Sequence, residues 1–354
     1  MASKVTFNNT SGQLMFVEAG KTGMISTGVP EVFDNGFDGH AKLTLLDSYG
    51  QFFIKGDASG KPIMYFRHTD IGKNQFRFGN LVDLGDHYLS YHKGVYHAEE
   101  VAQADTPLNG YRQIKEGVYG FDSEEKFMEE RIYEDHVTIK EGDFFDVKFV
   151  PWGPTFFDHQ TLYPNSSVIF QPCMIIGEFD GQPVVGFGSF DRFCVSNKIR
   201  GFDNVQFGYI ALGGAGMRAD GRKEQFSVNI SLTGDGKVYG MYYLEGERPV
   251  FADCVTMEAV WEHLPYVDDG TCVYKDAVIG IGSHTIHFNG KWGAKGFLKE
   301  PRLDKHGQSQ IFGTWYEGDI SYDHKLFFTF GENMEAYDYN LKKLGFDVKE
   351  NISL

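Results

Sequence analysis

The sequence lacks any run of lysines and arginines, and its formal net charge at pH 7 is -16. Phosphate backbones are bound by clustered basic side chains, so these features argue against a nucleic-acid partner. No segment approaches the roughly 20 apolar residues of a membrane-spanning helix. The opening stretch "MASKVTFNNTSG" has no apolar core of the kind a signal peptide needs. We therefore expect a cytoplasmic protein with no membrane span.

Cysteine is scarce and the motifs of common cofactors are missing. The four cysteines are widely spaced and form no CxxC, which predicts reduced, buried thiols: Cys173, Cys194, Cys254 and Cys272. The stretch "GFGSFD" lacks the third glycine and the following helix of a dinucleotide site. There is no P-loop, no GxSxG and no HExxH. These negatives predict an enzyme or binding protein without a cofactor or metal.

Helical periodicity is rare, whereas strand-like runs separated by turns are frequent. The chain has 32 Phe, 19 Tyr and 43 Gly, a mixture that favours pleated sheets punctuated by turns. Residues 252–264 fit an amphipathic helix or a strand with a bulge, and residues 333–346 fit a short C-terminal helix. Hairpins at 8 to 12 residue spacing predict an all-β antiparallel sandwich or barrel with few short helices.

The length of 354 residues fits two domains of ordinary size. We predict an N-terminal β-barrel-like domain over residues 1–200 and a C-terminal one over residues 201–354. The glycine-rich "GGAGMRADGR" (213–222) is interpreted as a loop or linker in the region 195–225 where they meet.

One hairpin carries a family resemblance. The segment "MIIGEFDGQPVVGFGSFDR" resembles the part of carotenoid hydratase and kievitone hydratase relatives in which a hairpin leads into Gly-x-Gly and a polar cluster. The resemblance implies tandem lipocalin-like barrels and an apolar ligand. In those relatives a His and a Trp follow the Gly-x-Gly, whereas this chain has Asp191, Arg192 and Phe193.

The charged pair after this Gly-x-Gly is the first candidate site. On a regular strand, side chains alternate, so Asp191 and Arg192 point to opposite faces. A buried Asp191 with a raised pKa could protonate an alkene or act as a base, and Arg192 could bind a substrate oxygen. The alternative is a buried ion pair that closes the fold.

Two aromatic stretches supply the remaining candidates. "PWGPTFFDHQTLYP" and "YLSYHKGVYH" place aromatic rings beside titratable groups, as in an apolar pocket with a few polar points. The predicted proton-transfer partners of Asp191 are His159, Tyr163 and His92. The predicted substrate-binding aromatics are Trp152, Phe157, Tyr91 and Phe187. The alternative for these stretches is ordinary core or surface packing. His284 and His287 would share a metal-binding face on a helix, but their segment is typical of a strand, which splits them.

Three functions stay open from the sequence. The first is a cofactor-independent lyase or isomerase (a hydratase, dehydratase or cyclase) that acts on a hydrophobic small molecule by acid–base catalysis. The second is a non-catalytic protein that binds or transfers a lipid or isoprenoid. The third, weaker one is carbohydrate recognition. Titratable groups that converge within hydrogen-bond reach would favour the enzyme over the carrier. A homodimer is compatible with the sequence.

Overall fold

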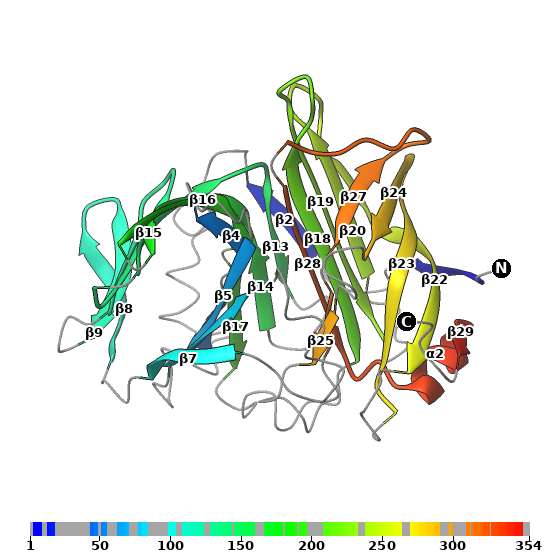
Figure 1. Ribbon diagram of the computed structural model, residues 1–354, viewed down its shortest axis with the longest axis horizontal. Coiled ribbons are helices and arrows are strands. Elements are labelled where there is room, and N and C mark those ends of the chain that lie inside the picture. The colour runs from blue at the N-terminus through cyan, green and yellow to red at the C-terminus, as the bar shows by residue number, and fades with distance from the viewer. Residues whose placement is uncertain are drawn as a thin grey trace. The chain divides into compact units, whose positions relative to one another are not determined.

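In the computed structural model, the regular secondary structure of the described residues is almost entirely β-strand (Figure 1). It describes residues 3–8, 13–17, 43–48, 51–54, 62–70, 77–83, 98–103, 108–123, 128–143, 145–159, 166–179, 181–189, 191–196, 208–232, 238–263, 270–290, 297–299, 309–311, 313–325 and 327–349. Within this part of the chain the one α-helix is α2 (Asp338–Leu344). No helix in the described ranges has the length and apolar character to cross a membrane. The predicted all-β class is confirmed.

The chain divides into two compact units that do not follow the order of the sequence. Unit 1 comprises Met1–Gly12, Leu84–His97 and Gln206–Leu354, and unit 2 comprises Gln13–Asp83 and Ala98–Val205. The first strand of the chain therefore belongs with its C-terminal part. Each unit is described by itself below.

Unit 1 contains two sheets. In order across sheet A, its described strands are β1 (Lys4–Asn8), β22 (Cys254–His263), β23 (Cys272–Ile281), β24 (His284–Asn289) and β27 (Thr314–Glu317), with β29 (Asp347–Lys349) parallel to β22. In order across sheet C, they are β21 (Val250–Ala252), β20 (Val238–Leu244), β19 (Lys223–Ser231), β18 (Tyr209–Met217), β28 (Phe327–Met334), β26 (Ser309–Ile311) and β25 (Phe297–Lys299).

The two sheets of unit 1 pack face to face around an aromatic core. Trp315 of sheet A meets Phe226 of sheet C edge to face, with ring centroids 4.8 Å apart. Gly240 of β20 lets Val255 and Ile281 approach the backbone of sheet C closely. The interdigitation of inner faces is the arrangement of a β-sandwich.

The described strands of unit 2 form one long sheet in which all neighbours are antiparallel. In order, its strands are β2 (Gln13–Val17), β13 (Thr155–His159), β14 (Ser166–Phe170), β17 (Asp191–Ser196), β3 (Leu43–Ser48), β5 (Pro62–Asp70), β4 (Gln51–Ile54), β16 (Gln182–Ser189), β15 (Pro172–Phe179), β12 (Phe145–Pro151), β11 (Val137–Glu141), β10 (Met128–Ile132), β9 (Val118–Ser123) and β8 (Leu108–Lys115). Two further strands, β6 (Arg77–Asp83) and β7 (Ala98–Gln103), continue from β5. In these described pairings the first and last strands do not meet, so no barrel is closed by hydrogen bonds.

Strand periodicity explains the local structure where the sequence left two choices open. Residues 254–263 form β22, and its apolar side chains Val255, Met257 and Ala259 alternate into the core. The register shifts between Ala259 and Trp261, which is a bulge that keeps Trp261 fully buried. The strand with a bulge is therefore correct for this segment, and the helix is wrong.

Of two other predictions from the sequence, one is confirmed and one is partly wrong. The short C-terminal helix is confirmed as α2, which ends at Gly345 in the left-handed region with φ 98°. The loop or linker predicted for residues 213–222 is wrong over its first half, because Gly213–Met217 lies inside β18. Only the turn that follows, around Gly221, is irregular. Consecutive glycines in a strand mark a close approach by another group.

The cysteines differ in environment. Cys173 and Cys272 are buried, as predicted, but Cys254 is exposed at the start of β22. That position follows from the alternation of β22, in which Val255 takes the inward place. The side chain of Cys194 lies outside the described residues.

Candidate functional site

The hairpin that carries the predicted Asp191–Arg192 pair is formed. Pro172 pairs with Ser189, and Ile169 pairs with Arg192, so one register continues through β15·β16 and β14·β17. Asp191 and Arg192 are the first two residues of β17, as alternating strand positions require. On the other side of β17, Arg192 stands opposite Asp47 of β3. For Asp191 and Arg192 the structure describes the backbone and not the side chains.

Other predicted residues of unit 2 are also placed by register. His159 is the last residue of β13 and lies opposite Ser167. Phe157 pairs with Ile169, which on its other side pairs with Arg192. Phe187 lies in β16 opposite Met174. Trp152 is buried just after β12, where its backbone N–H donates to Pro172 O at 2.9 Å. Tyr91, His92 and Tyr163 fall outside the described residues, so the roles given to this set stay predictions.

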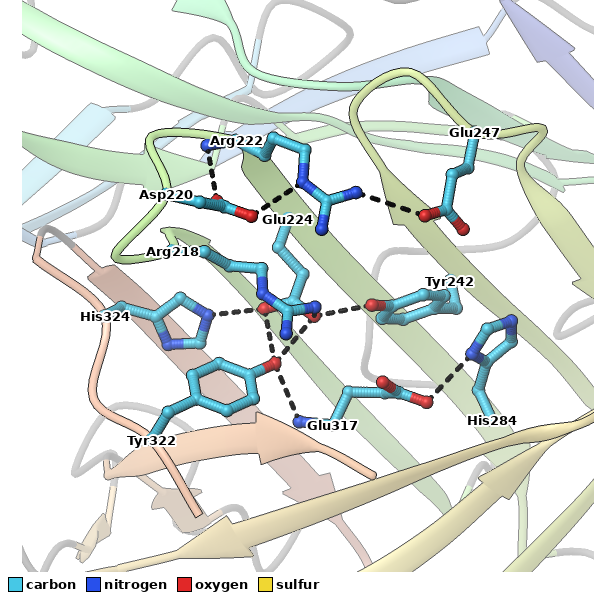
Figure 2. Close-up of polar contacts among 10 residues, drawn as sticks. All are labelled: Arg218, Asp220, Arg222, Glu224, Tyr242, Glu247, His284, Glu317, Tyr322 and His324. Carbon is cyan, nitrogen blue, oxygen red and sulfur yellow. Dashed lines mark hydrogen bonds and ion pairs between the residues drawn. The ribbon is translucent and has the colours of Figure 1, made fainter. Parts of the chain in front are cut away.

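A convergence of titratable side chains lies instead in unit 1, around Glu224. Figure 2 shows the carboxylate of Glu224 at the centre, with His324 and Tyr322 on one side and Tyr242 on the other. Tyr242 Oη donates to Glu224 Oε1 at 2.5 Å, and His324 Nε2 lies 2.8 Å from Oε2. Tyr322 Oη lies 2.8 and 2.7 Å from the two carboxylate oxygens. We call these four residues the Glu224 cluster.

Strand pairing explains how the cluster is assembled. Glu224 lies opposite Leu244 and Phe226 opposite Tyr242, so Glu224 and Tyr242 are diagonal neighbours on one face of β19·β20. Tyr322 and His324 come from the segment that follows β27, where Lys325 N donates to Met217 O at 2.9 Å. This backbone bond ties the segment to the end of β18.

The glycines of β18 make room for this segment. A Cβ on Gly216 would lie 2.4 Å from the ring of His324, and one on Gly214 would lie 2.5 Å from Trp315 Nε1. The rings of Trp315 and His324 are themselves 4.3 Å apart. The sequence "GGAG" therefore allows two aromatic rings to rest directly on the strand, with His324 aimed at Glu224.

The electrostatics of the cluster favour an ionised Glu224. Burial opposes the charge of this fully buried carboxylate, but the hydrogen bonds from His324, Tyr242 and Tyr322 outweigh burial and lower its pKa. Burial and the neighbouring Glu224 both raise the pKa of Tyr242 and of Tyr322. The two phenols thus keep their protons and act as fixed donors to the carboxylate.

A histidine–carboxylate pair lies next to the cluster. His284 Nδ1 is 3.0 Å from Glu317 Oε1, and the ring of His284 stacks on Tyr242 with centroids 4.1 Å apart. Because Ile286 pairs with Glu317, His284 and Glu317 are diagonal neighbours on the inner face of β24·β27. The backbone N–H of Glu317 donates to Tyr322 Oη at 3.0 Å, which joins the pair to the Glu224 cluster. Both side chains of the pair keep 21% of their surface exposed, enough to meet a ligand.

Arg218 covers the outer side of the cluster. Its guanidinium lies over the ring of Tyr322, 4.6 Å from the centroid, and Nη1 is 3.5 Å from Glu224 Oε1. Burial opposes its charge, but attraction from Tyr322 and Glu224 outweighs burial and raises the pKa of Arg218. The site therefore contains a fixed cation beside two histidines, two phenols and two carboxylates.

The sequence pointed to only a small part of this arrangement. His284 was singled out together with His287, and β24 separates them as predicted: His287 stacks on Tyr316 instead, with centroids 4.7 Å apart. Glu224, Tyr242 and Tyr322 were missed, because they come from segments up to 98 residues apart. The usable signal was "GGAG", whose glycines mark the close approach of His324. In the ranges where side chains are described, no group of three or more His, Cys, Asp or Glu is arranged to hold a metal ion.

Comparison with known proteins gives similarity at the level of structure. No family model matches the sequence, and no curated protein matches it. A protein from Nitrosomonas europaea, provisionally named AttH, is similar over 86% of this chain and 96% of its own, with a TM-score of 0.45 and 12% identity. Kievitone hydratase from Nectria haematococca is similar over 83% of this chain and 89% of its own, with a TM-score of 0.41 and 8% identity.

Proposed function

We propose that this chain is a cofactor-independent enzyme of the hydro-lyase or isomerase type, which moves protons on a hydrophobic small molecule. The observation that carries the proposal is the His284–Glu317 pair, stacked on Tyr242 and joined to the Glu224 cluster through Tyr322. A nucleophile or base oriented by a third group is a recurring arrangement in proton-transfer sites.

The contact between His284 and Glu317 favours one tautomer of the histidine. An ionised Glu317 can only accept a hydrogen bond, so Nδ1 of His284 carries the hydrogen that lies between them. In the neutral ring Nε2 then holds the lone pair and acts as the base. With no described protein group hydrogen-bonded to it, Nε2 is left for substrate or water. An imidazole ring can both accept a proton at one nitrogen and return it from there.

In the hydration direction, His284 Nε2 takes a proton from water while the water oxygen forms a bond to one alkene carbon. The proton returns from the imidazolium to the other carbon, so that one water is added and the histidine is regenerated. Dehydration is the reverse. An isomerisation needs only the proton to leave one carbon and return to another. Glu317 stabilises the imidazolium that forms in each case.

The Glu224 cluster supplies rigidity. Its buried carboxylate accepts hydrogen bonds from three side chains, and two of them contact the His284–Glu317 pair. Tyr242 stacks on the ring of His284, and Tyr322 accepts from the backbone N–H of Glu317. A catalytic group held by packing and hydrogen bonds keeps its geometry through the reaction. A passive carrier of an apolar ligand needs no such convergence of titratable groups.

The test compares His284 with its neighbour His287, which lies on the same strand and faces the other side. The wild type, His284→Gln, Glu317→Gln and His287→Gln are incubated in ¹⁸O-labelled water with the small molecules that co-purify with the protein. Mass spectrometry then measures label incorporation. We expect His284→Gln and Glu317→Gln to lower incorporation by about 100-fold or more, as for a lost general base, and His287→Gln to leave it unchanged. Equal incorporation in His284→Gln and wild type would contradict the proposal, as would an absence of any mass change with the wild type in both labelled and deuterated water.

A further inference from the structure

Arg218 has more hydrogen-bonding capacity than its described partners use. A guanidinium has five N–H donors in a fixed fork, yet the side-chain contacts of Arg218 are one long contact to Glu224 at 3.5 Å and the ring of Tyr322. Its side chain is 26% exposed. By contrast Arg222, four residues along the same hairpin, is engaged by Asp220 at 2.8 Å and Glu247 at 3.2 Å.

The backbone holds Arg218 in place. Its N–H donates to Arg222 O at 3.0 Å, and its carbonyl accepts from Gly221 N–H at 2.9 Å, which closes the turn between β18 and β19. The guanidinium carbon lies over the Tyr322 ring, 4.6 Å from its centroid, in a cation–π contact. The cation is therefore fixed by the turn and the ring while its donors remain largely uncommitted.

Arg218 and His284 are connected through Tyr322 and Glu317. Tyr322 lies under Arg218, and its hydroxyl accepts from the backbone of Glu317, whose side chain holds His284. Figure 2 shows Arg218 next to Tyr322, and His284 next to Tyr242 and the carboxylate of Glu317. A base and a fixed cation that belong to one connected network suit a substrate in which negative charge develops on an oxygen when the base acts.

We propose that Arg218 binds a carbonyl oxygen of the substrate, so that the substrates are apolar molecules whose reacting double bond is conjugated to a carbonyl group. This inference rests on the proposed function. Hydroxide oxygen, formed as His284 takes a proton from water, bonds to the carbon distal to the carbonyl. The π electrons move onto the carbonyl oxygen, where Arg218 stabilises the enolate. The enolate electrons then take the proton from the imidazolium at the carbon next to the carbonyl, which completes the addition of water.

The experiment measures binding of a matched pair of probes, 4-phenyl-3-buten-2-one and 1-phenyl-1-butene, which share a skeleton and differ in the carbonyl. Binding is measured by ligand-observed NMR for the wild type, Arg218→Gln, Arg218→Lys and Arg222→Gln. A hydrogen bond to a charged group corresponds to about tenfold in affinity. We expect the wild type and Arg222→Gln to prefer the ketone by about that factor, and Arg218→Gln to lose the preference. Arg218→Lys, which keeps the charge without the fork, should retain part of it.

A second measurement separates this inference from the proposed function. The experiment follows deuterium incorporation from deuterated water at C3 of the ketone, the alkene carbon next to the carbonyl. It compares the wild type, His284→Gln and Arg218→Gln. Incorporation that depends on His284 but not on Arg218 would overturn the role of Arg218 while supporting acid–base catalysis. A ketone preference that depends on Arg218, without any His284-dependent incorporation, would support the binding role and contradict the catalytic one. Equal binding of the two probes to the wild type, or binding of neither, would overturn the inference. Unchanged circular dichroism of each variant shows that the fold is retained.

Discussion

Glu224 is the residue on which the candidate site depends most. Its fully buried carboxylate accepts from Tyr242, Tyr322 and His324 and lies beside Arg218. Removing one partner of a buried charged network leaves the other groups desolvated and unpaired. The same change at an exposed carboxylate has little consequence, because water replaces the lost contact.

We expect Glu224→Ala to lower the free energy of unfolding by about 3–5 kcal/mol. Glu247→Ala is the matched control, since Glu247 is exposed and its ion pair among the described residues is with Arg222, and it should unfold as the wild type does. Urea unfolding followed by tryptophan fluorescence checks both variants. An equal loss in the two would show that Glu224 is not the anchor of the cluster.

The pH dependence of stability follows from the same hydrogen bonds. The pKa of Glu224 is lowered in the folded protein, so its contribution is present above the ordinary glutamate pKa of about 4.3 and is lost as pH falls through the folded value. The pKa values of Tyr242 and Tyr322 are raised, so their contribution is present below the ordinary tyrosine pKa of about 10 and is lost as pH rises above it.

Thermal unfolding from pH 3 to pH 11 should therefore show one decline below about pH 4 and another above about pH 10. Glu224→Gln should flatten the acid decline relative to the wild type. Tyr242→Phe should reduce the alkaline one. Other carboxylates contribute to acid unfolding, so the comparison is between variants; a Glu224→Gln profile parallel to that of the wild type would contradict the assignment.

At the level of elements, the glycines of β18 decide where His324 lies. A methyl group on Gly216 would lie 2.4 Å from the His324 ring, and the neighbouring Trp315 ring, 4.3 Å away between centroids, limits where the histidine can move. We expect Gly216→Ala to destabilise the protein by about 1–3 kcal/mol through overpacking and to displace His324 from Glu224. Unfolding measurements give the first effect, and the histidine ring resonances in NMR give the second.

Gly280→Ala is the control for that substitution. Gly280 is also a strand glycine of unit 1, but the atom nearest to an added Cβ is Thr256 Oγ1, the end of a side chain that can rotate away. Both variants add one methyl group to a strand glycine, but at different sites. A smaller effect for Gly216→Ala than for Gly280→Ala would show that β18 does not hold the histidine.

The sequence predicted individual strands better than it predicted their assembly. The hairpin of residues 166–196, the strand His284–Asn289 and helix α2 were all foreseeable, because alternation and turn residues act over short distances. The glycines of β18 were interpreted as a linker, because glycine signals a turn unless the ring that packs on it is known. Strand pairing brings Tyr242 to Glu224, and the segment that follows β27 brings Tyr322 and His324. The sequence contains neither contact in any local form.

At the level of the whole molecule, the N-terminal strand belongs to the C-terminal unit. β1 pairs with β22 from Lys4↔Glu258 to Asn8↔Cys254, and Ser3 donates to the carboxylate of Asp347 at 2.9 Å. Val5 and Phe7 are buried, and Phe7 packs against Phe346 with ring centroids 5.9 Å apart. A boundary drawn by sequence order alone, such as the predicted division after residue 200, separates β1 from its partner strand.

Deleting residues 1–8 should therefore destabilise unit 1 although the deleted residues lie more than 200 positions from the candidate site. The deletion exposes one edge of β22 and removes the burial of Val5 and Phe7; loss of a buried Phe side chain alone corresponds to about 3–5 kcal/mol. Hydrogen exchange followed by mass spectrometry should show faster exchange in β22 and β29, with exchange in β9–β12 of unit 2 unchanged. Lys4→Ala, at an exposed position of the same strand, should leave both regions as in the wild type. Equal acceleration in the two units would mean that β1 stabilises the chain in some way other than by completing sheet A.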